Sequence, residues 1–421
     1  MTLRTLAAAC GVALFAQFAV SPPAIAADAP SRWVAAWATA LQPIPQQANL
    51  PPLYRAPEVA GRTVRQIVYP TLAGSTARIH LSNEYGKAPL VVQALRIARS
   101  TGGAAQSNAG VVVTFGGKES VTVPPGDELD SDAVAIEIVA GAPYAISSYM
   151  GAEQRLVAWH RVSSQVNYVS LPGNHADDAM AGAFHQRFTQ FAWVTGLSVE
   201  APSSDAVAAI GDSITDGMRS SLNENRRWPD AFARRLTREG NRSTAVVNLG
   251  ISGNRLLNDS PCYGDALAKR FGRDVLEHPG VKTAILLIGI NDINFSSTPA
   301  RAGLDCDYPH TSVAAADLIA GYQRVIAEAH RRGVRVFGAT LTPASLPPQR
   351  ESIRLAVNQW IRTTRALDGV VDFDAALRDP AQPDRLRRGF DSGDNIHPSD
   401  AGYAAMAEAI PLDAVVNSTR K

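Results

Sequence analysis

The alternation of apolar and polar positions changes character near residue 203. Before that point, short β-branched runs are separated by clusters of Gly, Pro and Asn, as in antiparallel sandwiches. Examples of the strands expected from these runs are 63–70, 77–83, 110–115, 121–127 and 133–139. We therefore predict a β-rich, sandwich-like region in the first half of the chain.

From residue 206 the pattern alternates between short buried runs and helical spacing. Trp228, Phe232 and Leu236, for example, recur at i, i+4 and i+8. The alternation predicts an α/β domain, a three-layer structure in which helices cover both faces of a parallel sheet. Strands are expected at 206–210, 243–250, 282–289, 334–341 and 370–374, and helices around 228–236, 267–275, 312–332, 351–366 and 399–410.

The first 27 residues have the pattern of a signal peptide. Arg4 precedes an apolar stretch at 5–20, and Ala-Ile-Ala at 24–26 has the small-x-small form of a cleavage site. The stretch is shorter than a membrane span. We predict export to the periplasm or the medium, without stable membrane insertion after cleavage. A lipoprotein anchor at Cys10 is a less favoured alternative, because too little apolar sequence precedes it.

Length and charge limit the number of domains and the kinds of binding partner. The 421 residues allow two sizeable domains, which we place at 28–202 and 203–421. The 40 Lys and Arg residues nearly balance the 39 Asp and Glu residues, so nothing indicates a nucleic-acid partner. The sequence carries no indication of oligomeric state.

Two cysteines, Cys262 and Cys306, follow the signal segment. In an oxidising compartment one disulfide is the simplest explanation of the pair. Such a bridge would close a loop of about 45 residues and restrict the unfolded chain by roughly 4 kcal/mol. Two unrelated buried thiols are the alternative.

Residues that could carry chemistry follow the expected strands of the second half. Ser213 follows the first strand, Gly253 the second and Asn291 the third, while Asp394 and His397 lie beyond the last. In open parallel sheets, ligands bind at the carboxyl ends of the strands, where these residues are expected to lie. Ester hydrolysis by serine needs a base, an acid that orients the base, and oxyanion donors. We predict Ser213 as nucleophile, His397 as base and Asp394 as acid, with donors from the amides of Ser213 and Gly253 and the side chain of Asn291.

The same segments, GDSITDG, GISGN, GIND and DNIHP, resemble in this order the four blocks of the SGNH/GDSL hydrolase superfamily. The resemblance covers about 205–412 and implies the same five residues, a flavodoxin-like domain, and hydrolysis of carboxylic esters with no metal or cofactor. Neighbouring phrases such as DSGDNIHPSDAGYAAMA resemble a subgroup of exported acylhydrolases related to one found with xylan-degrading genes. In that subgroup a β-rich region often precedes the catalytic domain.

Other polar residues near these blocks are assigned structural roles. Asp212 is expected to cap a turn or helix, and Asn254 and Asp292 to make structural hydrogen bonds. Two groups are interpreted as solvated loops rather than metal sites: His175 with Asp177 and Asp178, and Asp305 with Asp307 and His310. Four arginines are interpreted as a solvated helix face: Arg226, Arg227, Arg234 and Arg235.

The predicted function is an exported serine ester hydrolase of the esterase or carbohydrate O-acetylesterase type, acting on a small-molecule or polysaccharide ester. A lipid-directed lipase is one alternative. A secreted carbohydrate-binding protein with an inert hydrolase half is another, from a different class. Whether the β-rich region binds polysaccharide or serves as a scaffold is left open by the sequence.

Overall fold

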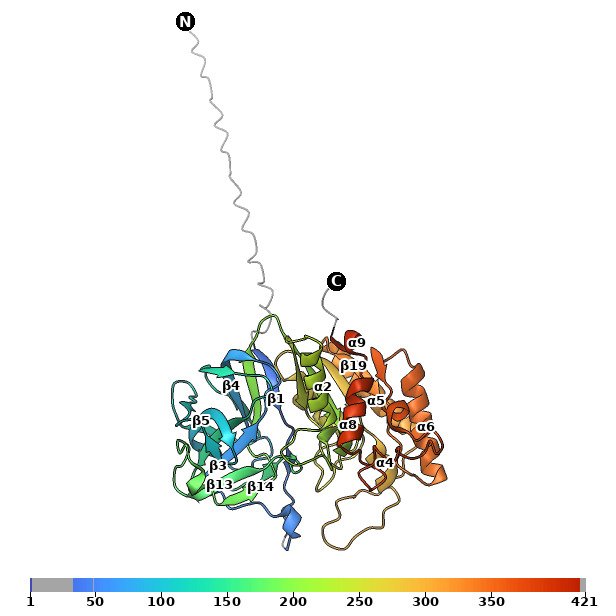
Figure 1. Cartoon of the computed structure of the whole chain (residues 1–421), viewed down its shortest axis with the longest axis horizontal. Coiled ribbons are helices and arrows are strands. Elements are labelled where there is room, and N and C mark those ends of the chain that lie inside the picture. The colour runs from blue at the N-terminus through green and yellow to red at the C-terminus, as the bar shows by residue number, and fades with distance from the viewer. Residues whose placement is uncertain (2–32, 48, 417–421) are drawn as a thin grey trace. The chain divides into compact units, whose positions relative to one another are not determined.

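The computed structural model describes residue 1 and residues 33–47 and 49–416 (Figure 1). The signal peptide predicted at 1–27 therefore lies, apart from Met1, outside the described residues. Within the described part of the chain, no helix combines the length and the apolar character that crossing a membrane requires.

The first half of the chain forms antiparallel sheets, as predicted. Residues from both larger sheets belong to one buried core. The first sheet has the order β1 (Trp33–Ala38), β15 (Val194–Glu200), β4 (Gly74–Ser82), β10 (Val134–Ile138), with β9 (Glu128–Asp130) paired to β4. The second has the order β14 (Gln186–Phe188), β13 (Asn167–Pro172), β3 (Arg62–Val68), β11 (Tyr144–Met150), β5 (Leu90–Gly102), β6 (Ala105–Gln106), with β7 (Val111–Val112) and β8 (Val121–Val123) on β5. A small pair joins β2 (Gln42–Pro43) to β12 (Ala158–Trp159), and two short 3₁₀ turns are η1 (Pro52–Tyr54) and η2 (Ala181–Ala183).

Side-chain alternation explains why these strands form. In β4, Ala77, Ile79 and Leu81 are fully buried, while the residues between them are partly exposed. The strand expected at 110–115 is shorter than predicted. It stops at Val112, and a turn closed by two hydrogen bonds between the backbones of Phe115 and Lys118 follows.

The second half contains a five-stranded parallel sheet, as predicted. Its order is β17-β16-β18-β19-β20, which is the 2-1-3-4-5 order of flavodoxin-like sheets. The strands are β16 (Asp205–Gly211), β17 (Thr244–Asn248), β18 (Val281–Leu287), β19 (Arg335–Ala339) and β20 (Gly369–Val371). The strand order reverses at β16, so the crevice expected to bind a ligand lies at the carboxyl ends of β16 and its neighbours.

Helices connect these strands (Figure 1). α2 packs against α8 and β17, and α5 against α6 and β19; the three-layer arrangement itself stays a prediction. The helices are α1 (Ser213–Asp216), α2 (Trp228–Arg238), α3 (Leu267–Phe271) with the π-helical turn η3 (Gly272–Leu276), α4 (Ile290–Phe295), α5 (Ala315–Arg331), α6 (Pro348–Thr363), α7 (Phe373–Leu377), α8 (Asp400–Ala409) and α9 (Leu412–Val416).

Two expectations about this half are wrong in part. The strand expected at 370–374 ends at Val371, because the Asp372 side chain accepts from the Ala375 N–H and begins α7. The arginines of α2 are not all solvated. Arg227 pairs with Asp230 and is 12% exposed, and Arg235 donates to the carbonyl oxygens of residues 407, 408 and 410. Carbonyl groups at the end of a helix lack partners within it, and Arg235 supplies them for α8.

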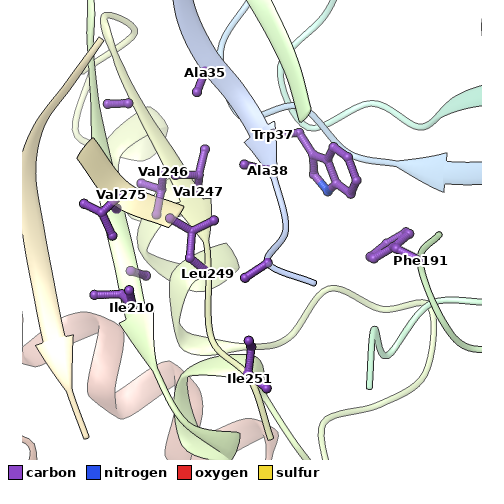
Figure 2. Packing of buried hydrophobic residues seen from close by; sticks show 14 of the residues in the cluster. Ala35, Trp37, Ala38, Phe191, Ile210, Val246, Val247, Leu249, Ile251 and Val275 are labelled. Carbon is purple, nitrogen blue, oxygen red and sulfur yellow. The ribbon is translucent and has the colours of Figure 1, made fainter. Parts of the chain in front are cut away.

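The two regions pack together along β1 and β17 (Figure 2). Trp37 and Ala38 of β1 and Val246 and Val247 of β17 are all buried in the same core. The Ala35 N–H also donates to the Pro279 carbonyl oxygen at 2.9 Å. One core therefore continues from the β-rich region (residues 33–200) into the α/β region (residues 205–416).

Candidate active site

Ser213 lies at the sharp turn between β16 and α1. An added Cβ at Gly211 would lie 2.1 Å from the Leu287 carbonyl oxygen and 2.5 Å from Thr215 Oγ1, so the turn requires glycine there. The Asp212 side chain accepts from the Ile214 N–H at 3.0 Å, which confirms its predicted capping role. Ser213 is 4% exposed. The fold thus holds the serine at the carboxyl edge of the sheet.

The structure brings together the three residues predicted as a triad. Ser213 Oγ lies 2.8 Å from His397 Nε2, and His397 Nδ1 lies 2.8 Å from Asp394 Oδ2. Both distances are ordinary hydrogen bonds. With Nδ1 donating to the carboxylate, Nε2 is free to accept the serine proton. This is the arrangement that makes a serine hydroxyl nucleophilic.

The loop before α8 fixes the Asp394 carboxylate. Its Oδ1 accepts from the N–H groups of Ile396 (3.1 Å) and His397 (2.8 Å), and its Oδ2 also accepts from Arg219 Nε (3.1 Å). Burial opposes ionisation of this carboxyl, but the hydrogen bonds from His397 and Ile396 outweigh it and hold the pKa of Asp394 well below its usual range. Asp394 therefore stays ionised and orients the His397 ring.

The three predicted oxyanion donors follow three different strands: Ser213 begins α1, Gly253 lies in a turn after β17, and Asn291 lies in α4. The N–H groups of Ser213 and Gly253 have no hydrogen-bond acceptor among the described residues. Asn291 Nδ2 donates one hydrogen to the Asn254 carbonyl oxygen at 2.9 Å, which leaves its second hydrogen available. Gly253 has φ +85°, and an added Cβ would lie 2.5 Å from the Tyr263 ring. Glycine is therefore required at this position.

Buried polar groups that the sequence analysis did not identify hold the Gly253 loop. Arg270, at 0% exposure, donates to Asn254 Oδ1 (3.0 Å) and to the Leu249 carbonyl oxygen (3.0 Å). Asp292 accepts from the N–H groups at 256–257, and Asn254 donates to two backbone carbonyl groups. The structural roles predicted for Asn254 and Asp292 are confirmed. Arg270 could be read from the sequence only as a helix residue.

The carboxylate of Asp216 joins the segment after β16 to the segment after β17. Asp216 ends α1, and its Oδ2 accepts from both the N–H (2.9 Å) and Oγ (2.6 Å) of Ser252. Ser252 directly precedes Gly253. The turn that bears Ser213 and the turn that bears Gly253 are thus joined through one buried side chain.

Burial also changes the protonation of two acids beneath the site. It raises the pKa of Asp212 to about 7, with a further contribution from the negative charges of Asp292 and Asp216. It raises the pKa of Asp292 to about 6, against the hydrogen bonds that Asp292 accepts. Asp394 is therefore the ionised acid of the predicted triad, while burial disfavours ionisation of Asp212 and Asp292.

Among the described residues, the two remaining cysteines and the candidate metal ligands make no hydrogen bond to Ser213, His397 or Asp394. Cys262 and Cys306 form a disulfide. His175 pairs with Asp178 at 2.9 Å, and His310 pairs with Asp305 at 2.8 Å. Within residues 33–47 and 49–416, no cluster of three or more His, Cys, Asp or Glu side chains has the arrangement of a metal site.

Part of the chain matches a known protein family. Residues 209–405, which include all five predicted site residues, match the model of the GDSL-like Lipase/Acylhydrolase family. These residues form a GDSL-like lipase/acylhydrolase domain. No curated protein sequence matches the chain.

Solved structures similar to this chain cover about half of it. A lipolytic protein of the G-D-S-L family from Desulfitobacterium hafniense DCB-2 is 21% identical, over 49% of this chain and 97% of its own, with a TM-score of 0.37. A catalytic mutant of an acetylxylan esterase from Geobacillus stearothermophilus is 21% identical, over 52% and 98%, with a TM-score of 0.38. A GDSL-like lipase from Bacteroides thetaiotaomicron VPI-5482 is 17% identical, over 50% and 87%, with a TM-score of 0.34.

Proposed function

We propose that this protein hydrolyses carboxylic esters through an acyl-serine intermediate on Ser213. The observation that carries the proposal is the continuous hydrogen-bonded series from Ser213 Oγ through His397 to Asp394. It occurs within a GDSL-like lipase/acylhydrolase domain, beside two backbone N–H groups that donate to none of the described residues and one free amide hydrogen of Asn291. An inert hydrolase half would have no physical need for both sets of groups.

The proposed cycle uses only these side chains. His397 Nε2 takes the proton of Ser213 Oγ as the oxygen attacks the ester carbonyl carbon. The carbonyl oxygen becomes an oxyanion, which the donors of Ser213, Gly253 and Asn291 stabilise. His397 then gives this proton to the leaving alcohol as the ester C–O bond breaks. It next takes a proton from a water molecule that attacks the acyl-serine, and returns that proton to Ser213 Oγ as the acid leaves.

We propose a short acyl group as the preferred substrate portion, as in a carbohydrate O-acetylester. Ser213 is almost fully buried, and the Tyr263 ring lies against Gly253 and 5.6 Å from the Phe295 ring. Aromatic side chains close to the oxyanion glycine support a small acyl pocket rather than a wide apolar cleft. We further propose that the enzyme is exported after loss of residues 1–27 and consists of domains at 28–202 and 203–421. The signal-like N-terminal pattern and the disulfide support export.

The test is hydrolysis of chromogenic esters from acetyl to palmitoyl by the purified protein, beside Ser213→Ala. We expect the highest kcat/KM with acetyl or propionyl, and no turnover above background by Ser213→Ala. A maximum at octanoyl or longer would contradict the short acyl preference and leave the hydrolase assignment standing. Turnover that survives in Ser213→Ala, or no turnover of any ester by the wild type, would contradict the assignment itself.

A further inference from the structure

His160 of the β-rich region reaches the candidate site from outside the α/β region. It follows β12, and its backbone forms an isolated bridge with Phe191, on whose ring its own ring stacks. The side chain is 3% exposed. Its Nε2 lies 2.9 Å from Asp216 Oδ1, 56 positions along the chain. A buried histidine of one region is therefore paired with a buried carboxylate of the other.

Hydrogen-bond partners on both sides fix the orientation of the His160 ring. Nδ1 faces the Ala40 carbonyl oxygen at 3.0 Å, and Nε2 faces the Val162 carbonyl oxygen at 3.1 Å as well as Asp216. Each of these oxygen atoms can accept a hydrogen bond, so the His160 ring is held between acceptors on both of its nitrogen-bearing edges.

Asp216 passes this contact on to the oxyanion loop. Its Oδ1 is held by His160, while its Oδ2 holds the N–H and hydroxyl of Ser252, the residue before Gly253. The loop comes so close to α1 that an added Cβ at Gly250 would lie 2.3 Å from the Asp216 N–H nitrogen. The carboxylate is 1% exposed, so no water can replace a lost partner without rearrangement.

We propose that His160 is a positioning residue for ester hydrolysis: through Asp216 it sets the orientation of Ser252 and so aims the Gly253 N–H at the developing oxyanion. The proposal rests on the proposed function, and it gives the β-rich region a part in the reaction. Oxyanion stabilisation depends on donors held in place before the reaction begins. Loss of His160 would leave a buried carboxylate with one side unpaired, and its rotation would turn Ser252 and Gly253 away.

The test compares His160→Gln with Thr71→Val. Thr71 also joins the two regions, because its Oγ1 bonds to the backbones of Ala36 and Val246, yet it touches neither Asp216 nor Ser252. For His160→Gln we expect kcat on a short-chain ester to fall about 10- to 100-fold, with KM within about threefold of wild type. Thr71→Val should keep kcat within about twofold of wild type, even if its thermal midpoint falls as much as that of His160→Gln.

A boronic acid provides a second readout, because its adduct with Ser213 places an oxygen anion where the reaction does. Its affinity should fall for His160→Gln by about the same factor as kcat/KM, and stay unchanged for Thr71→Val. A folded His160→Gln protein with wild-type kcat, or equal loss in both variants, would overturn the proposal.

Two further variants separate the possible failures. If His160→Gln does not fold, Ser252→Ala removes one donor to Asp216 from within the α/β region, and a folded Ser252→Ala protein with unchanged kcat would also overturn the proposal. Ser213→Ala in the same assay tests the proposed function separately, since residual turnover there counts against the nucleophile and not against His160.

Discussion

The β-rich region and the α/β region contribute to the candidate site in different ways. All five residues proposed to act on the ester lie in the α/β region, in loops or helix starts that come after parallel strands. The β-rich region contributes side chains that hold those loops: His160 bonds to Asp216, Gln42 to the Cys262 carbonyl oxygen, and Tyr54 to Cys306 Sγ. Chemistry and support are thus divided between the regions, and variants in each should fail differently.

The largest effect is expected from Asp394, which tests the catalytic role proposed for the α/β region. Asp394→Asn keeps the size of the side chain but removes the acceptor that fixes the His397 tautomer. We expect kcat to fall about 10⁴-fold, as is typical of such a change, with a thermal midpoint close to that of the wild type. Steady-state kinetics and a thermal melt of the same preparation measure both. A loss below tenfold would show that Asp394 is not the acid of the triad.

The disulfide tests the supporting role of the contacts between the two regions, because Gln42 and Tyr54 of the β-rich region bond to its two cysteines. Cys262→Ala with Cys306→Ala removes a bridge between positions 44 apart, and we expect the free energy of unfolding to fall by about 4 kcal/mol. Turnover per folded molecule should change less than in Asp394→Asn, because neither sulfur contacts the triad. Denaturant titration measures the first quantity and active-site-normalised kinetics the second. Unchanged stability with lost turnover would reverse the roles assigned to the two sides.

The smallest expected effect concerns Asp212, beneath the nucleophile. Its pKa is raised to about 7 by burial, so between about pH 4 and 7 the folded state keeps a proton that the unfolded state has lost. Its contribution to stability is therefore complete at low pH and is lost as the pH rises towards 7. Asn caps a helix equally well and carries no such proton. Relative to wild type, Asp212→Asn should therefore become progressively more stable as the pH rises from about 4 to about 7.

The measurement for Asp212→Asn is denaturant unfolding of both proteins at several values between pH 4 and 8. A difference in unfolding free energy that does not change with pH would show that Asp212 is ionised throughout. The buried acids of the α/β region would then differ from Asp394 in position only, not in charge.

The same division explains how much could be predicted from the sequence. The parallel strands and the residues after them follow from local patterns, and Asp394 and His397 are only three positions apart. Asp216 stands within the GDSITDG segment, but its role depends on Ser252 and His160, which are 36 and 56 positions away. No periodicity relates such residues, so tertiary contacts alone reveal them.

Strand β5 shows a second limit, in the β-rich region. Val92 and Leu95 are both fully buried although they are three positions apart. Strict alternation would place them on opposite faces. The pairing of β5 with β11 shifts register between Ala94 and Val92, and this irregularity brings both side chains into the core. The longest described strand of the region therefore lacks the strict alternation that marks β4.

The most direct test of the central claim is to identify the nucleophile, which a fluorophosphonate labels by forming a phosphorus–oxygen bond with release of fluoride. The purified protein is treated with a fluorophosphonate, which reacts with activated serine hydroxyls, and the modified peptide is located by mass spectrometry while esterase activity is followed. We predict one adduct per molecule, on Ser213, formed in proportion to the loss of activity and absent in His397→Ala. Modification of another residue in step with inactivation, or full activity after complete modification of Ser213, would contradict the account.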